Sequence, residues 1–236
     1  MRVNARFQQL AFLPQINESS NNFGMAFPIR LSGVALRVLI LCGALSAAST
    51  FSQTDRTKLF DREDACIRSE AATHFFRGAV LVGIDGKIVF ENAYGLGDYE
   101  IADGHIANAE FIDMSVPFSA GGIYSTVEDP YRWNEALTEN GKLLSADSLK
   151  QMFTEYSEAT HEGQHYGYGV VISRLKFGKL LYYHGGGVKG FSSSLQRYPN
   201  DRVCIVVLSN LDSYRPWELS DHIASDLFNQ PLSPVH

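Results

Sequence analysis

Two apolar runs lie on either side of Asp85-Gly86 in the stretch Phe76-Arg-Gly-Ala-Val-Leu-Val-Gly-Ile-Asp-Gly-Lys-Ile-Val-Phe-Glu-Asn-Ala-Tyr94. Asp-Gly between two apolar runs is the strongest short signal for a β-hairpin. The first run, Ala79–Ile84, is apolar at successive positions rather than at alternate ones. We therefore predict a hairpin whose first strand is buried on both faces.

Helical and strand patterns alternate along the rest of the chain. Residues 55–74 mix charged and apolar residues without Gly or Pro, which favours a surface helix. Further helices are predicted at 125–137, 145–153 and 217–228, and strands at 168–174, 179–183, 191–198 and 202–209. Strands toward both ends and helices between them indicate an α+β fold with one largely antiparallel sheet, flanked by N- and C-terminal helices.

Composition narrows the class of protein without giving its function. The 236 residues are 45% hydrophobic and carry a formal net charge of −6, which is typical of a globular protein of one or two domains. An acidic chain lacks the basic face that nucleic-acid binding needs. Cys66 and Cys204 could bridge in an oxidising compartment, but Cys204 lies in the apolar run 203–208, which favours a buried free thiol.

The N-terminal region has the pattern of a secretion signal. Arg30 and Arg37 precede an apolar run over residues 38–48, and Ser46 and Ala48 suit a signal-peptidase site. The run is shorter than the roughly 20 residues that span a bilayer. We therefore predict a signal peptide region at 1–48, with Met25 as the true start, and an exported, periplasmic or secreted domain at 49–236 without a stable membrane span. The alternative is a buried helix.

Three separated segments resemble, in the same order, the serine β-lactamase-like hydrolases, a group that includes class C β-lactamases, DD-peptidases and esterases. They are Phe76–Gly97, Ser119-Ala-Gly-Gly-Ile-Tyr-Ser-Thr-Val-Glu-Asp129, and Tyr183-His-Gly-Gly-Gly187 with residues 190–194 and 206–210. The resemblance covers about residues 60–230. It implies a β-lactamase/transpeptidase-like fold and hydrolysis of β-lactam, D-amino-acid peptide or ester bonds through an acyl-serine. It implies a small-molecule or peptide ligand, and neither a metal nor an organic cofactor.

The family's nucleophile motif is missing at its expected place. In the family, a serine in a Ser-x-x-Lys motif at a helix N-terminus is acylated, and a Tyr-x-Asn element follows. Only 23 residues separate Gly97 from Gly121, where the family carries a helical subdomain with both motifs. We therefore expect a truncated domain with most of that subdomain missing and with absent or impaired activity. Two alternatives stay open: a non-catalytic exported binding protein for cell-wall-like or acyl ligands, and an error in gene calling.

Two short matches to the missing motifs lie in the wrong secondary structure. Ser173-Arg-Leu-Lys176 ends a predicted strand, so no helical turn brings its serine and lysine together. Tyr198-Pro-Asn200 leads into a predicted turn. Neither is expected to be catalytic.

The family's third motif is present as His184-Gly185-Gly186. By resemblance, His184 would lie beside the substrate carboxylate or assist proton movement, and Gly185 and Gly186 would let substrate approach the strand edge. The alternative is an inherited flexible turn without a catalytic role. Residues 192–194, all serines, are predicted to be strand or bulge residues.

A different chemistry is suggested by His161-Glu-Gly-Gln-His165, which matches the His-Glu-x-x-His pattern of zinc hydrolases. That pattern needs a helix so that both imidazoles face one zinc ion. Gly163 and the following Tyr166-Gly-Tyr-Gly169 would break such a helix. We predict a polar loop here and no metal site.

The missing subdomain also has a consequence for packing. Residues 79–84 and 203–208 seek burial on both faces of the sheet, and the terminal helices can cover only one of them. Residues 98–160 would cover the second face in part. A large exposed apolar patch promotes association, so we expect weak stability or self-association through the uncovered sheet face.

Overall fold

The computed structural model describes residues 7–8, 53–73, 76–95, 100–102, 105–107, 111, 113, 115, 121–138, 143–159, 163–175 and 177–230. The helices are α1 (Gln53–Ala72), α2 (Glu128–Thr138), α3 (Ala146–Met152) and α4 (Pro216–Phe228). The strands are β1 (Phe7–Gln8), β2 (Gly78–Ile84), β3 (Lys87–Tyr94), β4 (Glu100–Ala102), β5 (His105–Ala107), β6 (Tyr124–Ser125), β7 (Ser157–Glu158), β8 (Gln164–Tyr166), β9 (Val171–Arg174), β10 (Leu180–Val188), β11 (Phe191–Tyr198) and β12 (Val203–Ser209).

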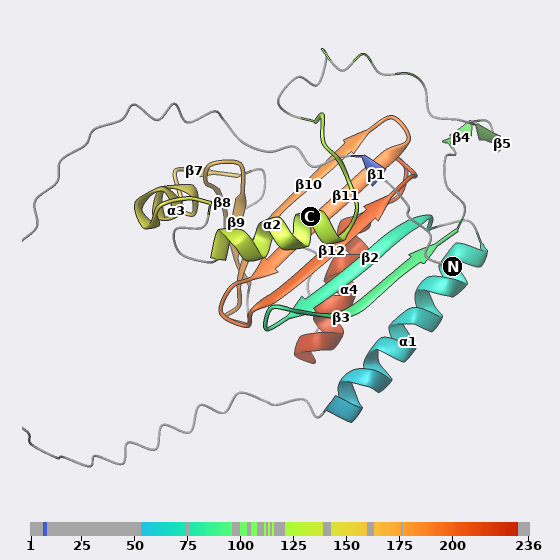
Figure 1. Ribbon diagram of the computed structural model, residues 1–236, viewed down its shortest axis with the longest axis horizontal. Helices are drawn as coiled ribbons and strands as arrows, with labels where there is room; N and C mark the ends of the chain where they lie inside the picture. The colour runs from blue at the N-terminus through green and yellow to red at the C-terminus, as the bar shows by residue number, and fades with distance from the viewer. Residues whose placement is uncertain are drawn as a thin grey trace, which may run out of the picture.

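One antiparallel sheet of eight strands forms the centre of the described structure, in the order β3-β2-β12-β11-β10-β9-β8-β7 (Figure 1). The predicted hairpin is confirmed as β2 and β3, and its two turn residues, Asp85 and Gly86, have φ values of 53° and 72°. Two consecutive positive φ values are those of the tight turn that follows the twist of a hairpin. Strand β2 pairs with β12 from Gly78 opposite Ser209 to Ile84 opposite Val203, so the two ends of the domain share one sheet.

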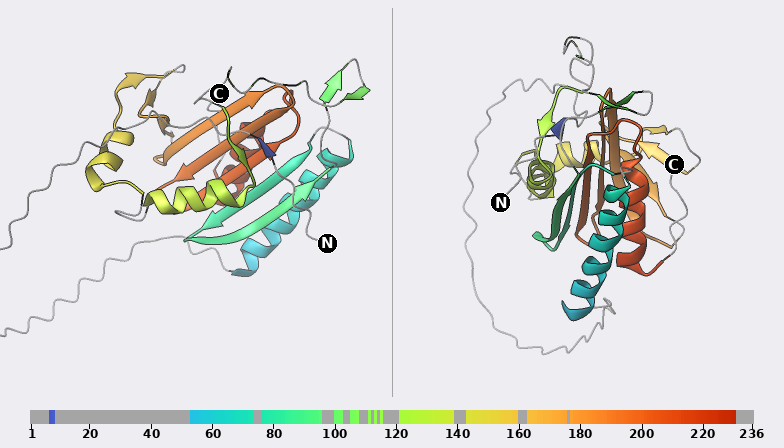
Figure 2. Two further views of the ribbon diagram at one scale, coloured as in Figure 1. Left: turned by 45° about the horizontal axis from the view of Figure 1, so that its top comes forward. Right: turned by 90° about the vertical axis from the view of Figure 1, so that its right-hand side faces the viewer.

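The sheet lies between helices on its two faces. Figure 2 shows α1 and α4 together on one face and α2 on the other. All seven residues of β2 and all seven of β12 are buried, as their apolar runs favour. The second face of these two strands is therefore covered, whereas the missing subdomain led us to expect it to be covered only in part. The α+β class and the terminal helices are therefore as predicted.

The larger part of the core lies between the sheet and the helix pair α1 and α4. Leu59, Phe60 and Ile67 of α1 pack against it, and the Phe60 and Phe90 rings stack with centroids 5.3 Å apart. Their spacing of one, seven and eight residues places them on one side of the helix. Glu63 lies on the same side of α1 and is only 1% exposed, so a carboxylate is buried among these apolar side chains.

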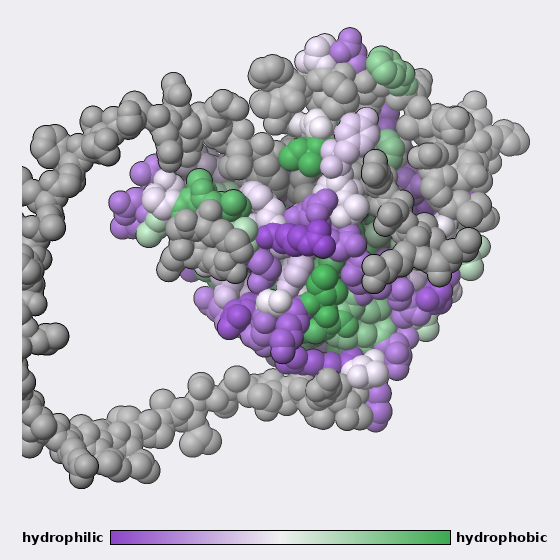
Figure 3. Space-filling model, viewed as in Figure 1, coloured by the Kyte–Doolittle hydropathy of each residue, from purple (hydrophilic) through white to green (hydrophobic). Residues whose placement is uncertain are grey.

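The second face is covered by α2. Tyr131 of α2 lies over β2, directly above Gly83, where any side chain would meet the tyrosine ring. Beside α2, Figure 3 shows apolar side chains gathered over the sheet, and Ile88 of the edge strand β3 is 43% exposed. Self-association through this face stays a prediction.

Three pairings were not anticipated from the sequence. Strand β10 continues through the glycines to Val188 instead of ending at residue 183. Strand β8 includes the last two residues of the 161–165 segment predicted to be a polar loop and pairs with β7, and β4 and β5 form a small hairpin in the stretch between Gly97 and Gly121.

Strand β1 pairs with β6 although residues 7–8 lie within the predicted signal peptide region. The remainder of residues 1–48 is outside the described residues, so the signal peptide stays a prediction. In the part of the chain that is described, no helix has both the length and the apolar character needed to cross a membrane.

Both cysteines of the described domain are free thiols, with Cys66 exposed and Cys204 buried. Cys204 is 1% exposed and packs with Leu81 and Val206 under α2. The prediction of a buried free thiol is confirmed, because this side chain fills apolar space as a small hydrophobe.

Candidate functional site

The third motif lies where β10 extends beyond its neighbour. Strand β10 pairs with β11 over residues 182–188, but it pairs with β9 only from Leu180 to Tyr183. Among the described strands, none pairs with the other edge of β10 from His184 onward. Gly185 and Gly187 are exposed there. An unpaired strand edge offers backbone N–H and C=O groups to an extended ligand.

The His184 imidazole is held at the start of this edge by two hydrogen bonds. Its Nδ1 lies 2.6 Å from the carbonyl oxygen of Gly185, and its Nε2 lies 2.8 Å from the hydroxyl of Tyr166 on β8. A carbonyl oxygen only accepts, so in the neutral ring Nδ1 donates and Nε2 accepts the Tyr166 proton. Burial raises the pKa of Tyr166, so its hydroxyl stays protonated at neutral pH. The two hydrogen bonds orient the His184 imidazole, and each of its nitrogens has a partner.

The neighbouring Tyr183 is also held by a side chain of β8. Its hydroxyl donates to Gln164 Oε1 at 2.8 Å, and both side chains are buried. Burial, followed by the negative charge of Asp221, raises the pKa of Tyr183 to about 12. Tyr166 and Gln164 both belong to β8, so this short strand fixes two consecutive residues of β10.

The space behind His184 is small. A cavity of about 20 Å³ lies between α2, α3 and β10 and is lined by Trp133, Phe153, Leu195 and Arg197, among others. This is enough for about one water molecule. A ligand at His184 would therefore lie along the strand edge rather than in a pocket beneath it.

The three serines opposite the glycines have structural partners, as the sequence predicted. Ser192 Oγ donates to the carbonyl of Leu211 at 2.7 Å, and Ser194 Oγ lies 3.0 Å from Ser220 Oγ. Ser193 is completely buried, with its Oγ 3.4 Å from the Gly186 carbonyl. These hydroxyls join β11 to its neighbours and to α4, and they do not point into the free edge.

The two short motif matches lie in the positions expected of structural residues. Ser173 is in β9, 5% exposed, and is paired with Leu181 on one side and Gln164 on the other. Tyr198 ends β11, is completely buried, and donates to Gln196 Oε1 at 2.9 Å.

The His-Glu-x-x-His match forms no helix in its described part. His165 lies in β8, with its Nε2 3.8 Å from Glu155 Oε2, whereas His161 is outside the described residues. Gly163 is a turn residue, but the predicted loop ends earlier than expected, because Gln164 and His165 already belong to β8, which pairs with both β7 and β9.

A family model that matches this chain shows its family. A family model described as beta-lactamase matches residues 98–225, which is more than half of the sequence. The chain belongs to the beta-lactamase family. The predicted resemblance to serine β-lactamase-like and penicillin-binding-protein-like hydrolases is therefore confirmed.

Several solved structures are similar to this member of the beta-lactamase family, and one of them, with a TM-score above 0.5, supports the fold. A penicillin-binding protein homologue from Pyrococcus abyssi, described as octameric, has a TM-score of 0.51 at 22% identity and aligns 59% of this chain with 32% of its own. A penicillin-binding protein from Bacillus halodurans is 27% identical over 45% of this chain and 32% of its own, with a TM-score of 0.42. A D-stereospecific amidohydrolase from Streptomyces sp. is 20% identical over 64% and 44%, with a TM-score of 0.48. No curated protein matches.

The chain thus spans about a third of the length of the two penicillin-binding proteins that it matches. The sequence led to the prediction of His184, Gly185 and Gly186 as site residues, which stays a prediction, but it gave no indication of Tyr166, which the sheet places against the imidazole from 18 residues away. The only local signal was the aromatic residue directly after His165. That Tyr166 contacts His184 becomes evident only when β8, β9 and β10 are aligned in the sheet.

Proposed function

We propose that this member of the beta-lactamase family does not form an acyl-serine. The sequence contains one Ser-x-x-Lys match, at Ser173, and that serine is buried in β9 rather than exposed at a helix N-terminus. Acylation needs a hydroxyl that a base can deprotonate next to the bound carbonyl. Loss of nucleophile and base together leaves only the effects of binding and electrostatics.

The edge of β10 supports a binding function that needs no acyl-serine. An extended ligand of the family's class, an acyl-D-amino-acid peptide or an opened β-lactam, would pair its amide groups with the backbone of residues 184–188. His184 would meet the ligand's carboxylate or carbonyl at one end of that edge, with its Nδ1–H leaving the Gly185 carbonyl to donate to the ligand. The observation that carries this proposal is that β10 continues beyond β9 with exposed glycines beside an imidazole oriented by Tyr166.

Export is proposed as the setting of this function. It is supported by the basic and apolar pattern of residues 30–48 and by the family. Cell fractionation with N-terminal sequencing of the recovered protein tests it. A chain that begins at Ser49 outside the cytoplasm supports export, and a chain retained in the cytoplasm with residues 30–48 contradicts it.

The binding proposal is tested by amide chemical-shift mapping with N-acetyl-D-alanyl-D-alanine and with benzylpenicillin. We expect saturable shifts at residues 184–188, unchanged ligand by mass spectrometry, and at least about tenfold weaker binding by His184→Ala. Tyr166→Phe should weaken binding less, because the His184 imidazole remains and loses only the hydrogen bond that orients it. His165→Ala, on the same strand as Tyr166, is the matched control and should bind normally. Shifts outside β10, or equal binding by H184A and H165A, would contradict the proposal.

A further inference from the structure

A buried carboxylate lies between the two helices that cover the sheet. Glu63 of α1 is 1% exposed, and neither of its oxygens has a hydrogen-bond partner. The nearest cationic groups stand beyond hydrogen-bond range or at its limit: Arg62 Nη2 is 3.8 Å from Oε1 and His222 Nε2 is 3.5 Å from Oε2. A buried carboxylate without a partner is strongly unfavourable. The Glu63 carboxylate therefore lacks a partner that would compensate its burial.

Two further donors converge on Glu63 from α4. His222 and Asp226 are four residues apart, so they lie on one face of that helix. The ligand atoms of Glu63, His222 and Asp226 all lie within 4.8 Å of one another. Burial, and then the neighbouring Asp226, raise the pKa of Glu63 to about 7. Two facing carboxylates in this position need a shared proton or a cation between them.

The chemistry of the three donors selects the kind of cation. One imidazole nitrogen and two carboxylates suit zinc and similar transition metals, whereas Mg²⁺ and Ca²⁺ prefer oxygen donors alone. Zinc bonds of about 2.0–2.2 Å place tetrahedral ligand atoms roughly 3.3–3.5 Å apart. Side-chain movements of about 1 Å would bring these donors from within 4.8 Å to that spacing.

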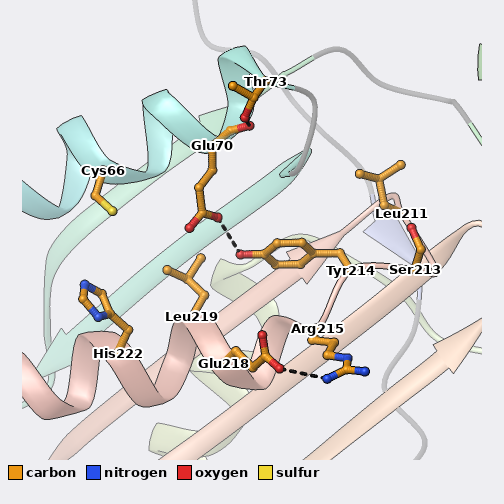
Figure 4. A pocket seen from close by; sticks show the side chains of 10 residues that line it. All are labelled: Cys66, Glu70, Thr73, Leu211, Ser213, Tyr214, Arg215, Glu218, Leu219 and His222. Atoms are coloured by element: carbon orange, nitrogen blue, oxygen red, sulfur yellow. Dashed lines mark hydrogen bonds and ion pairs between the residues drawn. The ribbon is translucent and has the colours of Figure 1, made fainter. Parts of the chain in front are cut away.

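The surroundings of the cluster leave it accessible from one side. His222 is half exposed and lines a groove of about 750 Å³ between α1 and α4. Figure 4 shows His222 on α4 and Cys66 on α1 facing each other across that groove. Of the three donors, His222 lines this groove, and Glu63 lies buried behind it. On the outer side, the exposed Arg62 contacts Asp226 and lies 3.8 Å from Glu63 Oε1, so one cation stands against two carboxylates.

We propose that Glu63, His222 and Asp226 form a binding site for Zn²⁺ or a similar divalent transition metal that links α1 to α4. The site is on the opposite face of the sheet from α2 and is independent of the β10 edge. Its role is structural: the metal joins the N-terminal and C-terminal helices of the domain and neutralises the buried Glu63 carboxylate.

The test is a titration of the full chain with Zn²⁺ in competition with a chromophoric chelator. All samples carry Cys66→Ser, so that zinc held by the exposed thiol is not counted. We expect one equivalent of zinc to bind, and a melting temperature that rises with zinc concentration. Loss of groups that only support a metal ligand costs about 10–100-fold in affinity, so His222→Ala and Glu63→Gln should each lose at least about 100-fold.

His165→Ala is the matched control, since it removes another partly exposed histidine beside a glutamate. It should bind zinc as tightly as the parent. Co²⁺ substitution should give the visible absorption of a low-coordinate nitrogen and oxygen site, lost in H222A. His222 is half exposed, so H222A tests the site even if E63Q unfolds, which circular dichroism would reveal. Absence of a stoichiometric zinc site, or equal affinity of H222A and H165A, overturns the proposal. So does a folded E63Q that binds zinc like the parent, because Glu63 then only shares a proton with Asp226.

Discussion

The packing of α2 on β2 can be tested by adding one methyl group at Gly83. A Cβ at this position would lie 2.7 Å from Cζ and 2.9 Å from the hydroxyl of Tyr131, which is itself 5% exposed. The ring atom Cε2 would lie closer still to the added Cβ, and ordinary carbon contacts are about 3.5–4.0 Å, so the ring must move by roughly 1.5 Å. Such overpacking costs about 1–3 kcal/mol. We expect Gly83→Ala to lower the free energy of unfolding by this amount.

A double-mutant cycle gives the sharper result. In a Tyr131→Leu background the ring is absent, and alanine is favoured over glycine inside a strand by about 0.5–1 kcal/mol. Gly83→Ala should therefore change from destabilising to neutral or stabilising. Urea unfolding followed by the fluorescence of Trp133, which lies on α2 against the same cluster, measures all four proteins.

A comparison with Gly78 separates the side-chain effect from a general intolerance of β2. A Cβ at Gly78 would meet the backbone of Leu208, with the carbonyl carbon at 2.9 Å, and backbone cannot move aside as a ring can. Gly78→Ala should be the more destabilising substitution and should stay so in the Tyr131→Leu background. If Gly83→Ala costs the same with and without Tyr131, α2 does not lie over β2 and the reasoning is wrong.

Three further predictions concern a helix cap, pH and association. Ser145 accepts a hydrogen bond from the Ser148 backbone at 3.1 Å, so Ser145→Ala should cost about 1 kcal/mol in urea unfolding, and an unchanged midpoint would contradict this cap. Burial raises the pKa of Tyr131 and Tyr183 to about 12, so the folded state keeps protons that the unfolded state releases near pH 10. The urea midpoint should fall as the pH rises from about 10 toward 12, and a flat profile would show that these hydroxyls ionise normally. The apolar surface beside α2 predicts self-association, so the sedimentation coefficient should rise with concentration, and a constant monomer value would contradict it.

The sheet could be predicted from the sequence wherever local signals and burial agree. The Asp85-Gly86 turn between apolar runs and the buried run 203–208 identify the strands of the centre, and Ser145 marks the start of α3. The two-sided burial of β2 followed from its unbroken apolar run. These features depend on neighbouring residues, and the tertiary structure reinforces what they favour separately.

The parts that could not be predicted depend on pairing partners. The three glycines after His184 have the local preference of a turn, yet they continue β10 because β11 provides a partner at each position. Polar Gln164 becomes buried because β8 lies between two strands and Tyr183 needs its amide oxygen. The carboxylate of Glu63 meets His222 only when α1 and α4 pack side by side on the sheet, and no sequence spacing indicates that contact.

The central claim is that this chain has the fold of its family without the acyl-serine chemistry. The most direct test is the intact mass of the folded protein after incubation with benzylpenicillin and, separately, with a reactive phosphonate. We predict no adduct with either reagent on a sample that circular dichroism shows to be folded. A stoichiometric adduct that maps to a single serine would contradict the claim and would identify the nucleophile.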